Sequence, residues 1–129
     1  AAGARAVGGD PDPAALVASA QNLRAAALPV ALVRWDGRRL PLQAASIEAA
    51  AANLPWGVQV ASAGALPALH EGLVRELARV LRPGARAALL TGSPELLPRD
   101  ALREEERRVI HLFGQRPTLV VLARAARAA

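Results

Sequence analysis

The stretch Asn53-Leu54-Pro55-Trp56-Gly57 combines residue types that could position an amine for reaction. Pro55 fixes its own φ angle and keeps Leu54 out of the helical region, so the backbone before it is extended and stiff. Gly57 then lets the chain turn sharply away. The five residues predict a rigid corner at the end of a buried strand, with an amide and an aromatic face at its tip.

Such a corner could orient a planar amino compound. Asn53 Oδ1 and a backbone carbonyl can accept hydrogen bonds from an exocyclic amine, while Trp56 stacks on the ring that carries the amine. The amine would then attack an electrophile without help from a strong base. The competing interpretation is a Pro-Gly turn with Trp56 as a core anchor, and for five residues alone it is the commoner of the two.

The composition argues for one domain without a metal centre. The chain has 129 residues, of which 53% are hydrophobic but only 2% are aromatic, so the core must consist mainly of Leu, Val and Ala. Cysteine is absent, which excludes a disulfide framework and a thiolate zinc site. The two histidines lie far apart in the sequence, so a metal site is not expected.

The charge favours a polyanionic partner. All sixteen basic residues are arginine and the net charge is +5, a balance that suits RNA or DNA. No apolar run approaches the roughly 20 residues needed to span a bilayer, and no signal-peptide pattern opens the sequence. We therefore expect a cytoplasmic protein; the sequence carries no signal for a particular oligomeric state.

Strands and helices are expected to alternate along most of the chain. Strands are predicted at residues 5–10, 30–35, 47–52, 85–91, 107–113 and 118–123, and helices at 13–27, 66–81 and from 93 into 103–106. The order β-α-β-β-α-β-α-β-β predicts an α/β fold whose sheet is mostly parallel, with an antiparallel hairpin at its C-terminal end.

Two of these segments have competing interpretations. Ala49 to Ala52 favour a helix by intrinsic propensity, but the alternating order of elements and the Asn53 corner favour a strand. Asp36-Gly37 is a good hairpin signal, yet Pro41 argues against a paired second arm, so we prefer a loop there.

The predicted helix at 66–81 has Leu69, Leu73, Leu77 and Val80 on its buried side. His70 is expected at the surface or rim of this helix. The second histidine, His111, is expected to be packed or exposed at an edge rather than to bind a ligand.

Several segments, taken together, resemble a known family. They are Gly8 to Pro13 with Ala20 and Asn22, Trp35-Asp36 with Leu40-Pro41, Asn53 to Gly57, Arg79 to Gly84, and the Gly114 hairpin. This set resembles the Rossmann-like class I methyltransferases that use S-adenosylmethionine. It is most similar to the RNA methylases that often carry a THUMP domain and modify tRNA guanine at N2.

The resemblance implies roles for individual residues. Asp10 would hold the ribose hydroxyls of S-adenosylmethionine, and Asp36 would contact the adenine amino group. The acceptor amine would be presented by Asn53, by the carbonyl of Leu54, and by Pro55 and Trp56. Methyl transfer depends on alignment of donor and acceptor, so no catalytic triad is expected.

The resemblance also implies an incomplete domain. Family members carry a first strand and a glycine-rich loop before the segment with which this chain begins, and that strand lies between the strands ending at Asp10 and Asn53. We therefore expect residues 1–129 to be an N-terminally incomplete methyltransferase domain that lacks its first central strand.

The expected activity is methylation of an exocyclic amine in RNA, with tRNA guanine N2 as the first candidate. An adenine or cytosine amino group in DNA, or a glutamine amide in protein, would need a similar corner. The alternative from another class is a non-catalytic module, a truncated methyltransferase fold that pairs with another chain or is a remnant.

Overall fold

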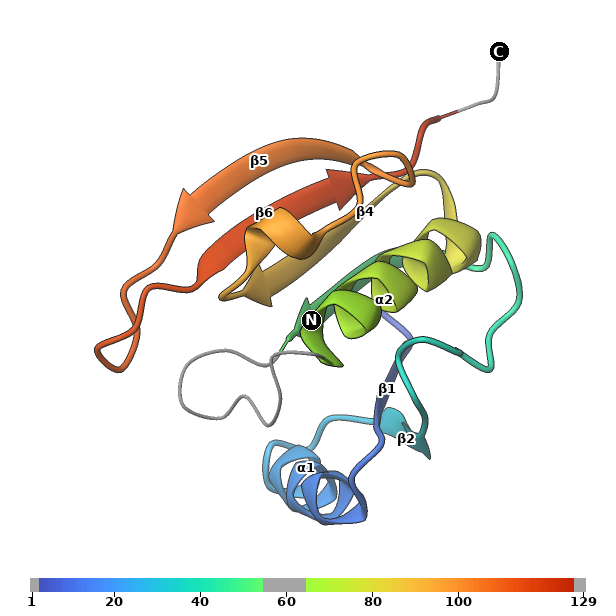
Figure 1. The fold of residues 1–129 in the computed structure, drawn as a ribbon. Helices are drawn as coiled ribbons and strands as arrows, with labels where there is room; N and C mark the ends of the chain where they lie inside the picture. Colours follow the sequence, from blue (N-terminus) through green and yellow to red (C-terminus); the bar gives the residue numbers. More distant parts are fainter. Residues whose placement is uncertain (1–2, 55–64, 127–129) are drawn as a thin grey trace. The chain divides into compact units, whose positions relative to one another are not determined.

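The computed structural model describes residues 3–54 and 65–126, and the chain divides into two compact units, Ala1–Pro41 and Leu42–Ala129. Each unit has its own sheet (Figure 1). Pro55, Trp56 and Gly57 of the predicted corner lie outside the described residues.

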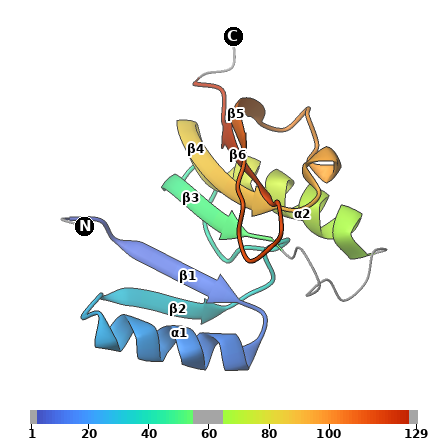
Figure 2. The same ribbon diagram turned by 90° about the vertical axis from the view of Figure 1, so that its left-hand side faces the viewer.

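The first unit contains two parallel strands and one helix. These elements are β1 (Ala6–Asp10), α1 (Pro13–Ala25) and β2 (Val30–Arg34), and α1 packs on β1 and β2 (Figure 2). Asp12 caps α1 by accepting a hydrogen bond from the Ala14 amide at 3.0 Å, and Pro13 follows at the first helical position. The predicted strands and helix are confirmed, although the helix ends two residues earlier than expected.

The second unit contains a four-stranded sheet in the order β3-β4-β6-β5. Its elements are β3 (Ile47–Asn53), α2 (Leu66–Val80), β4 (Leu81–Thr91), the short 3₁₀ helix η3 (Pro94–Leu96), β5 (Arg103–Val109) and β6 (Thr118–Ala123). β3 runs parallel to β4, whereas β6 runs antiparallel to both β4 and β5. The predicted parallel pairing and the C-terminal antiparallel hairpin are both confirmed.

The alanine-rich segment is a strand, as its position in the element order predicts. Ala50 and Ala52 lie opposite Ala87 and Leu89 of β4, on the face of the sheet that is buried in β4. Pairing with β4 and packing in this layer outweigh the helical preference of alanine, which is worth less than about 1 kcal/mol per residue.

Helix α2 covers that face and completes the core of the second unit (Figure 1). Its buried side chains pack with alternate residues of β4 and β6. The fully or almost fully buried apolar residues of these elements include Leu73, Val74, Leu77, Val80, Ala87, Leu89, Val120 and Leu122. Leu69 is only half-buried. His70 is fully buried, so the expectation of a surface histidine is wrong.

The prediction of a helix reaching into residues 103–106 is also wrong. η3 stops after three residues because Leu97 precedes Pro98, a position that disfavours helical backbone, and Leu97 is extended. The charged run instead forms β5, whose register against β6 shifts between Glu104 and Glu106. Arg103 and Glu105 form an ion pair of 2.7 Å, and Arg108 and Glu106 form one of 3.1 Å.

The first strand of each unit, β1 and β3, pairs with only one neighbour. The family resemblance predicts a further strand between those that end at Asp10 and Asn53, and residues 3–54 and 65–126 do not form it. In the same described residues, no helix is long and apolar enough to cross a membrane.

Two neighbouring glycines in β1 provide a test of the packing in the first unit. A Cβ atom at Gly9 would overlap the indole of Trp35, whereas a Cβ at Gly8 would meet Leu32 Cδ2 at 3.4 Å. We expect Gly9→Ala to lower the free energy of unfolding by about 1–3 kcal/mol, because overpacking must displace the indole. Gly8→Ala is the matched control and should have little effect. Equal melting temperatures for the two variants would contradict the packing of Trp35 on β1.

Candidate functional site

The described part of the predicted corner lies at the carboxyl end of β3. Asn53 is the last residue of β3 and is opposite Leu90, and the Leu54 amide donates a hydrogen bond of 2.8 Å to the Leu90 carbonyl. Leu54 is buried, with 3% of its surface exposed, while Asn53 is exposed. Leu54 therefore fixes the backbone from which Asn53 is presented. The roles predicted for Pro55 and Trp56 concern residues outside the described part of the chain.

A buried histidine lies close to this edge of the sheet. His70 Nε2 is 2.6 Å from Thr91 Oγ1, and His70 Nδ1 is 2.8 Å from the Leu66 carbonyl oxygen. The Ser93 amide donates to Thr91 Oγ1 at 3.0 Å. His70 and Thr91 are both fully buried.

The geometry of this cluster assigns the direction of each hydrogen bond. A carbonyl can only accept, so His70 Nδ1 carries a proton and donates to Leu66. In the neutral imidazole Nε2 is then an acceptor, and the Thr91 hydroxyl donates to it. The same hydroxyl accepts from the Ser93 amide, so every polar group in the chain of bonds is satisfied.

The cluster connects the first turn of α2 to the end of β4. Leu66 is the first residue of α2, and Thr91 is the last residue of β4, next to the residue that faces Asn53. The sequence contained a signal for this role that was missed. His70 lies three residues before Leu73 and four before Val74, the spacing of residues on one helix face.

In the first unit, Asp10 and Asp36 lie at the same edge of the sheet. Asp10 ends β1 opposite Arg34, the last residue of β2, and the Trp35 amide donates to the Asp10 carbonyl at 3.3 Å. Asp36 follows immediately. Both residues thus lie at the carboxyl ends of their strands; their cofactor contacts remain predictions.

The two carboxylates differ in their capacity to accept further hydrogen bonds. Asp10 Oδ1 accepts from the Asp12 amide at 2.8 Å, and Oδ2 accepts no bond from the described residues. Both oxygens of Asp36 are engaged by Arg38. Oδ1 accepts from the amide at 2.9 Å and from Nε at 3.0 Å, and Oδ2 accepts from Nη2 at 2.7 Å and from Nε at 3.2 Å, which uses the about four acceptor positions of a carboxylate.

These bonds lower the pKa of Asp36 from 3.8 to about 2, first through the side-chain hydrogen bonds from Arg38 and then through its amide. Because Asp10 Oδ2 accepts no bond from the described residues, Asp10 can accept hydrogen bonds from ribose hydroxyls directly. Asp36 could accept an adenine amine only if Arg38 gives up one of its bonds.

The turn at Asp36 is a loop, as preferred from the sequence. The Arg39 amide donates to the Asp36 carbonyl at 2.8 Å, and the two residues form an isolated bridge, but Arg38 to Leu42 form no strand.

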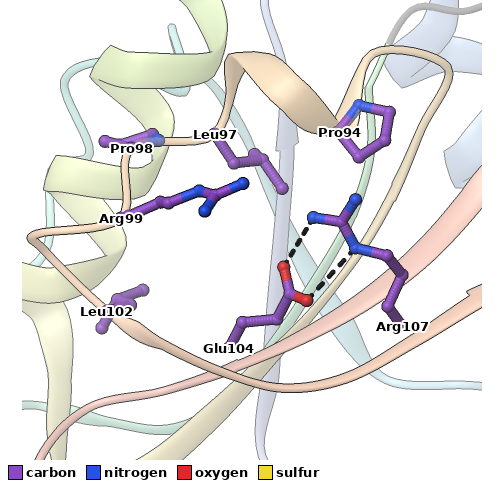
Figure 3. A pocket seen from close by; sticks show the side chains of 7 residues that line it. All are labelled: Pro94, Leu97, Pro98, Arg99, Leu102, Glu104 and Arg107. Atoms are coloured by element: carbon purple, nitrogen blue, oxygen red, sulfur yellow. Dashed lines mark hydrogen bonds and ion pairs between the residues drawn. The ribbon is translucent and has the colours of Figure 1, made fainter.

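A small cavity lies in the second unit, between the segment after β4 and β5 (Figure 3). It has a volume of about 270 Å³ and is lined by Pro94, Leu97, Pro98, Arg99, Leu102, Glu104 and Arg107. Arg107 is held by Glu104 through hydrogen bonds of 2.7 and 3.1 Å. The cavity contains none of the predicted site residues, and it is smaller than typical ligand pockets of about 300–1,000 Å³. Among the described residues, no group of three His, Asp or Glu side chains could hold a metal ion.

Comparison with known proteins connects these features to a family. Residues 2–120 match the model of a methyltransferase domain described as RMKL-like. Over 65 residues, half of this chain, the sequence is 40% identical to the tRNA (guanine(6)-N(2))-methyltransferase THUMP3 of Mus musculus.

Two solved structures illustrate the fold. TrmN from Thermus thermophilus superposes with a TM-score of 0.80 at 29% identity, over 93% of this chain and 36% of TrmN. An S-adenosylmethionine-dependent methyltransferase from Methanosarcina mazei superposes with a TM-score of 0.67 at 13% identity, over 94% of this chain and 82% of that one. The chain spans 13% of the length of the mouse protein.

The Asp36–Arg38 pair predicts a measurable titration. NMR titration of the Asp36 carboxyl should give a pKa of about 2, and Arg38→Ala should raise it toward 3.8 because the dominant hydrogen bonds are lost. Arg39→Ala is the control, since Arg39 acts only through a weaker charge effect. Because the folded-state pKa is lowered, the pair stabilises the fold above about pH 3.8, and this contribution disappears as the pH falls toward 2. An unchanged pKa in Arg38→Ala would contradict the assignment.

The His70 cluster predicts a coupling between two substitutions. Thr91→Val should destabilise the protein by about 1–3 kcal/mol, because His70 Nε2 and the Ser93 amide lose their partner in a buried site. Adding His70→Leu should cost less than the sum of the single substitutions, since an apolar pair leaves fewer buried polar groups unpaired. Thr118→Val is the control: its hydroxyl has no hydrogen bond to the described residues, and Thr118 lies opposite Thr91. Strict additivity in denaturant unfolding would exclude the coupling.

Proposed function

The chain belongs to the RMKL-like methyltransferase domain family, and we propose that its protein methylates the N2 amine of a guanine in tRNA with S-adenosylmethionine as donor. The observation that carries the proposal is the position of Asn53. It ends a parallel strand and is held at the carboxyl edge of the sheet by the buried Leu54 and the bond to Leu90. Ligands of open α/β sheets bind at this edge.

The substrate class is supported by similarity and by charge. The mouse relative, which is 40% identical over half of this chain, is named for guanine N2 methylation in tRNA. The net charge is +5 and all of the basic residues are arginine, which suits binding to an RNA phosphate backbone.

The acceptor side of the reaction needs orientation more than it needs a base. The side-chain oxygen of Asn53 can accept a hydrogen bond from the amine and so direct the nitrogen lone pair at the methyl group. The new N–C bond forms as the S–C bond breaks, and the surplus amine proton leaves to solvent or to an acceptor. Asn53 therefore acts as a positioning acceptor that contacts the reacting amine.

The donor side is assigned to the first unit. Asp10 is half-buried, and one of its oxygens can accept ribose O–H groups as a charged acceptor. When bound, S-adenosylmethionine supplies the electrophilic methyl group. Asp36 contributes to adenine recognition after Arg38 releases one hydrogen bond. Arg38 and the adenine amine therefore compete for the Asp36 carboxylate.

Two substitutions separate the donor role from the acceptor role. Both are made in the protein encoded by the whole reading frame. Asp10→Ala should weaken S-adenosylmethionine binding by about 1–3 kcal/mol in calorimetry, because a charged acceptor is lost. Asn53→Ala should leave that affinity unchanged but lower the methyl-transfer rate on unmodified tRNA by about 10²–10³.

Controls accompany both substitutions. Asp12→Ala removes a neighbouring carboxylate that caps α1, so it should affect stability but not cofactor affinity. Asn53→Asp keeps an acceptor oxygen and should retain part of the activity. A wild-type protein that binds neither the cofactor nor tRNA would instead support a non-catalytic module, and parallel losses in both variants would reject the separate roles.

A further inference from the structure

The hairpin that joins β5 and β6 extends from the same edge of the second unit as Asn53. Thr118, the first residue of β6, is opposite both Val109, which ends β5, and Thr91, which ends β4. Asn53 is opposite Leu90. Residues 110–117 therefore continue beyond the carboxyl ends of β3 and β4, as Figure 1 shows.

The tip of this hairpin has an unusual residue in a left-handed conformation. Leu112 and Gln115 exchange two backbone hydrogen bonds of 2.9 and 3.0 Å around Phe113 and Gly114. The φ angles of these two central residues are +50° and +71°, as in a type I′ turn, where Asn-Gly is preferred. Three non-glycine residues in the described chain have positive φ, and the other two are alanines. A bulky side chain is disfavoured in this region by steric contact with its own backbone.

Phe113 is also exposed to solvent over 91% of its surface. It is the most exposed of the large apolar residues in the described chain; Val109 at the base of the hairpin is 54% exposed. The backbone of Phe113 is thus strained, and the exposed ring gains no apolar packing that would offset the cost of this strain. A strained backbone conformation retained at an exposed site points to a function for the side chain.

The charge around the ring favours a nucleic acid over a protein partner. Residues 107–117 contain three arginines and a histidine but no acidic residue. Arg107 and Arg108 are paired with Glu104 and Glu106. Arg116, two residues after Gly114, forms no ion pair with the described residues. An exposed ring three residues before an arginine without an ion pair to the described residues suits stacking on an unpaired base with its phosphate neutralised nearby.

We propose that Phe113 stacks on an unpaired base of the RNA substrate and that Arg116 contacts an adjacent phosphate. The inference rests on the RNA methyltransferase function proposed above and assigns a substrate-binding role to the hairpin. Phe113 would hold the strand close to the edge at which Asn53 receives the target amine. It would affect RNA affinity and leave the methyl-transfer step unchanged.

The turn geometry supplies a substitution that removes the ring without harming the hairpin. Asn is favoured at the position of Phe113, so Phe113→Asn should raise the melting temperature or leave it unchanged. The Kd of the whole protein for an unmodified tRNA transcript should increase about 5- to 100-fold, which is the range for loss of one base–aromatic stack. The rate at saturating tRNA and the affinity for S-adenosylmethionine should not change.

Two variants serve as controls. Phe113→Trp retains a flat ring and should bind tRNA within about twofold of the wild type. Val109→Thr reduces exposed apolar surface at the base of the hairpin while keeping a β-branched residue, and its tRNA affinity should equal that of the wild type.

The outcomes separate this inference from the proposed function. If the wild type binds tRNA and a well-folded Phe113→Asn binds it equally, the role of Phe113 is rejected and the proposed function stands. If the wild type binds no tRNA, both are rejected. If Phe113→Asn changes sedimentation of the protein but not its tRNA affinity, the ring contacts a second copy of the chain and the stacking assignment is wrong.

Discussion

The parallel pairing of β3 with β4 is the constraint on which the acceptor side of the protein depends. Ala50 and Ala52 would favour a helix in isolation, but pairing with β4 and burial of one face of the sheet under α2 fix them as strand. The pairing ends with Asn53 opposite Leu90 and with the Leu54 amide bound to the Leu90 carbonyl. A shift by one residue would move Asn53 to the other face of the sheet.

The end of β4 is fixed independently by the His70 cluster. The bond from Thr91 to His70 and the bond from His70 to the Leu66 carbonyl tie this strand end to the first turn of α2. The hydroxyl of Thr91 also holds the Ser93 amide, which fixes the chain as it leaves the sheet. Asn53 therefore lies beside a strand end whose polar groups are fully satisfied, and a functional group needs such rigid support if its orientation is to be maintained.

The sequence predicted most of this fold because its local and positional signals agree. The Asp12 cap, the proline after it and the periodic apolar face of α2 each have a direct counterpart in the structure. The charged run in β5 is ambiguous in the sequence, because Glu104 pairs with Arg107 at a spacing that also suits a helix, whereas the pairing of Glu105 with Arg86 of β4 exists only in the folded sheet. His70 was misassigned because its polarity received more weight than its spacing to Leu73 and Val74. The bidentate bond from Arg38 to Asp36 also depends on loop geometry that composition does not reveal.

The proposed methyl acceptor is the N2 amine of a guanine in tRNA. The most direct test is to incubate the whole protein with unmodified tRNA and S-adenosylmethionine labelled with ¹³C in its methyl group, then to identify the labelled nucleosides by mass spectrometry after complete digestion. Parallel reactions contain duplex DNA or a glutamine-containing protein in place of tRNA. Guanine N2 methylation predicts labelled N2-methylguanosine from tRNA and no label in the other two reactions. Label in an adenine, a cytosine or a glutamine side chain, or the absence of label from all three, would contradict it.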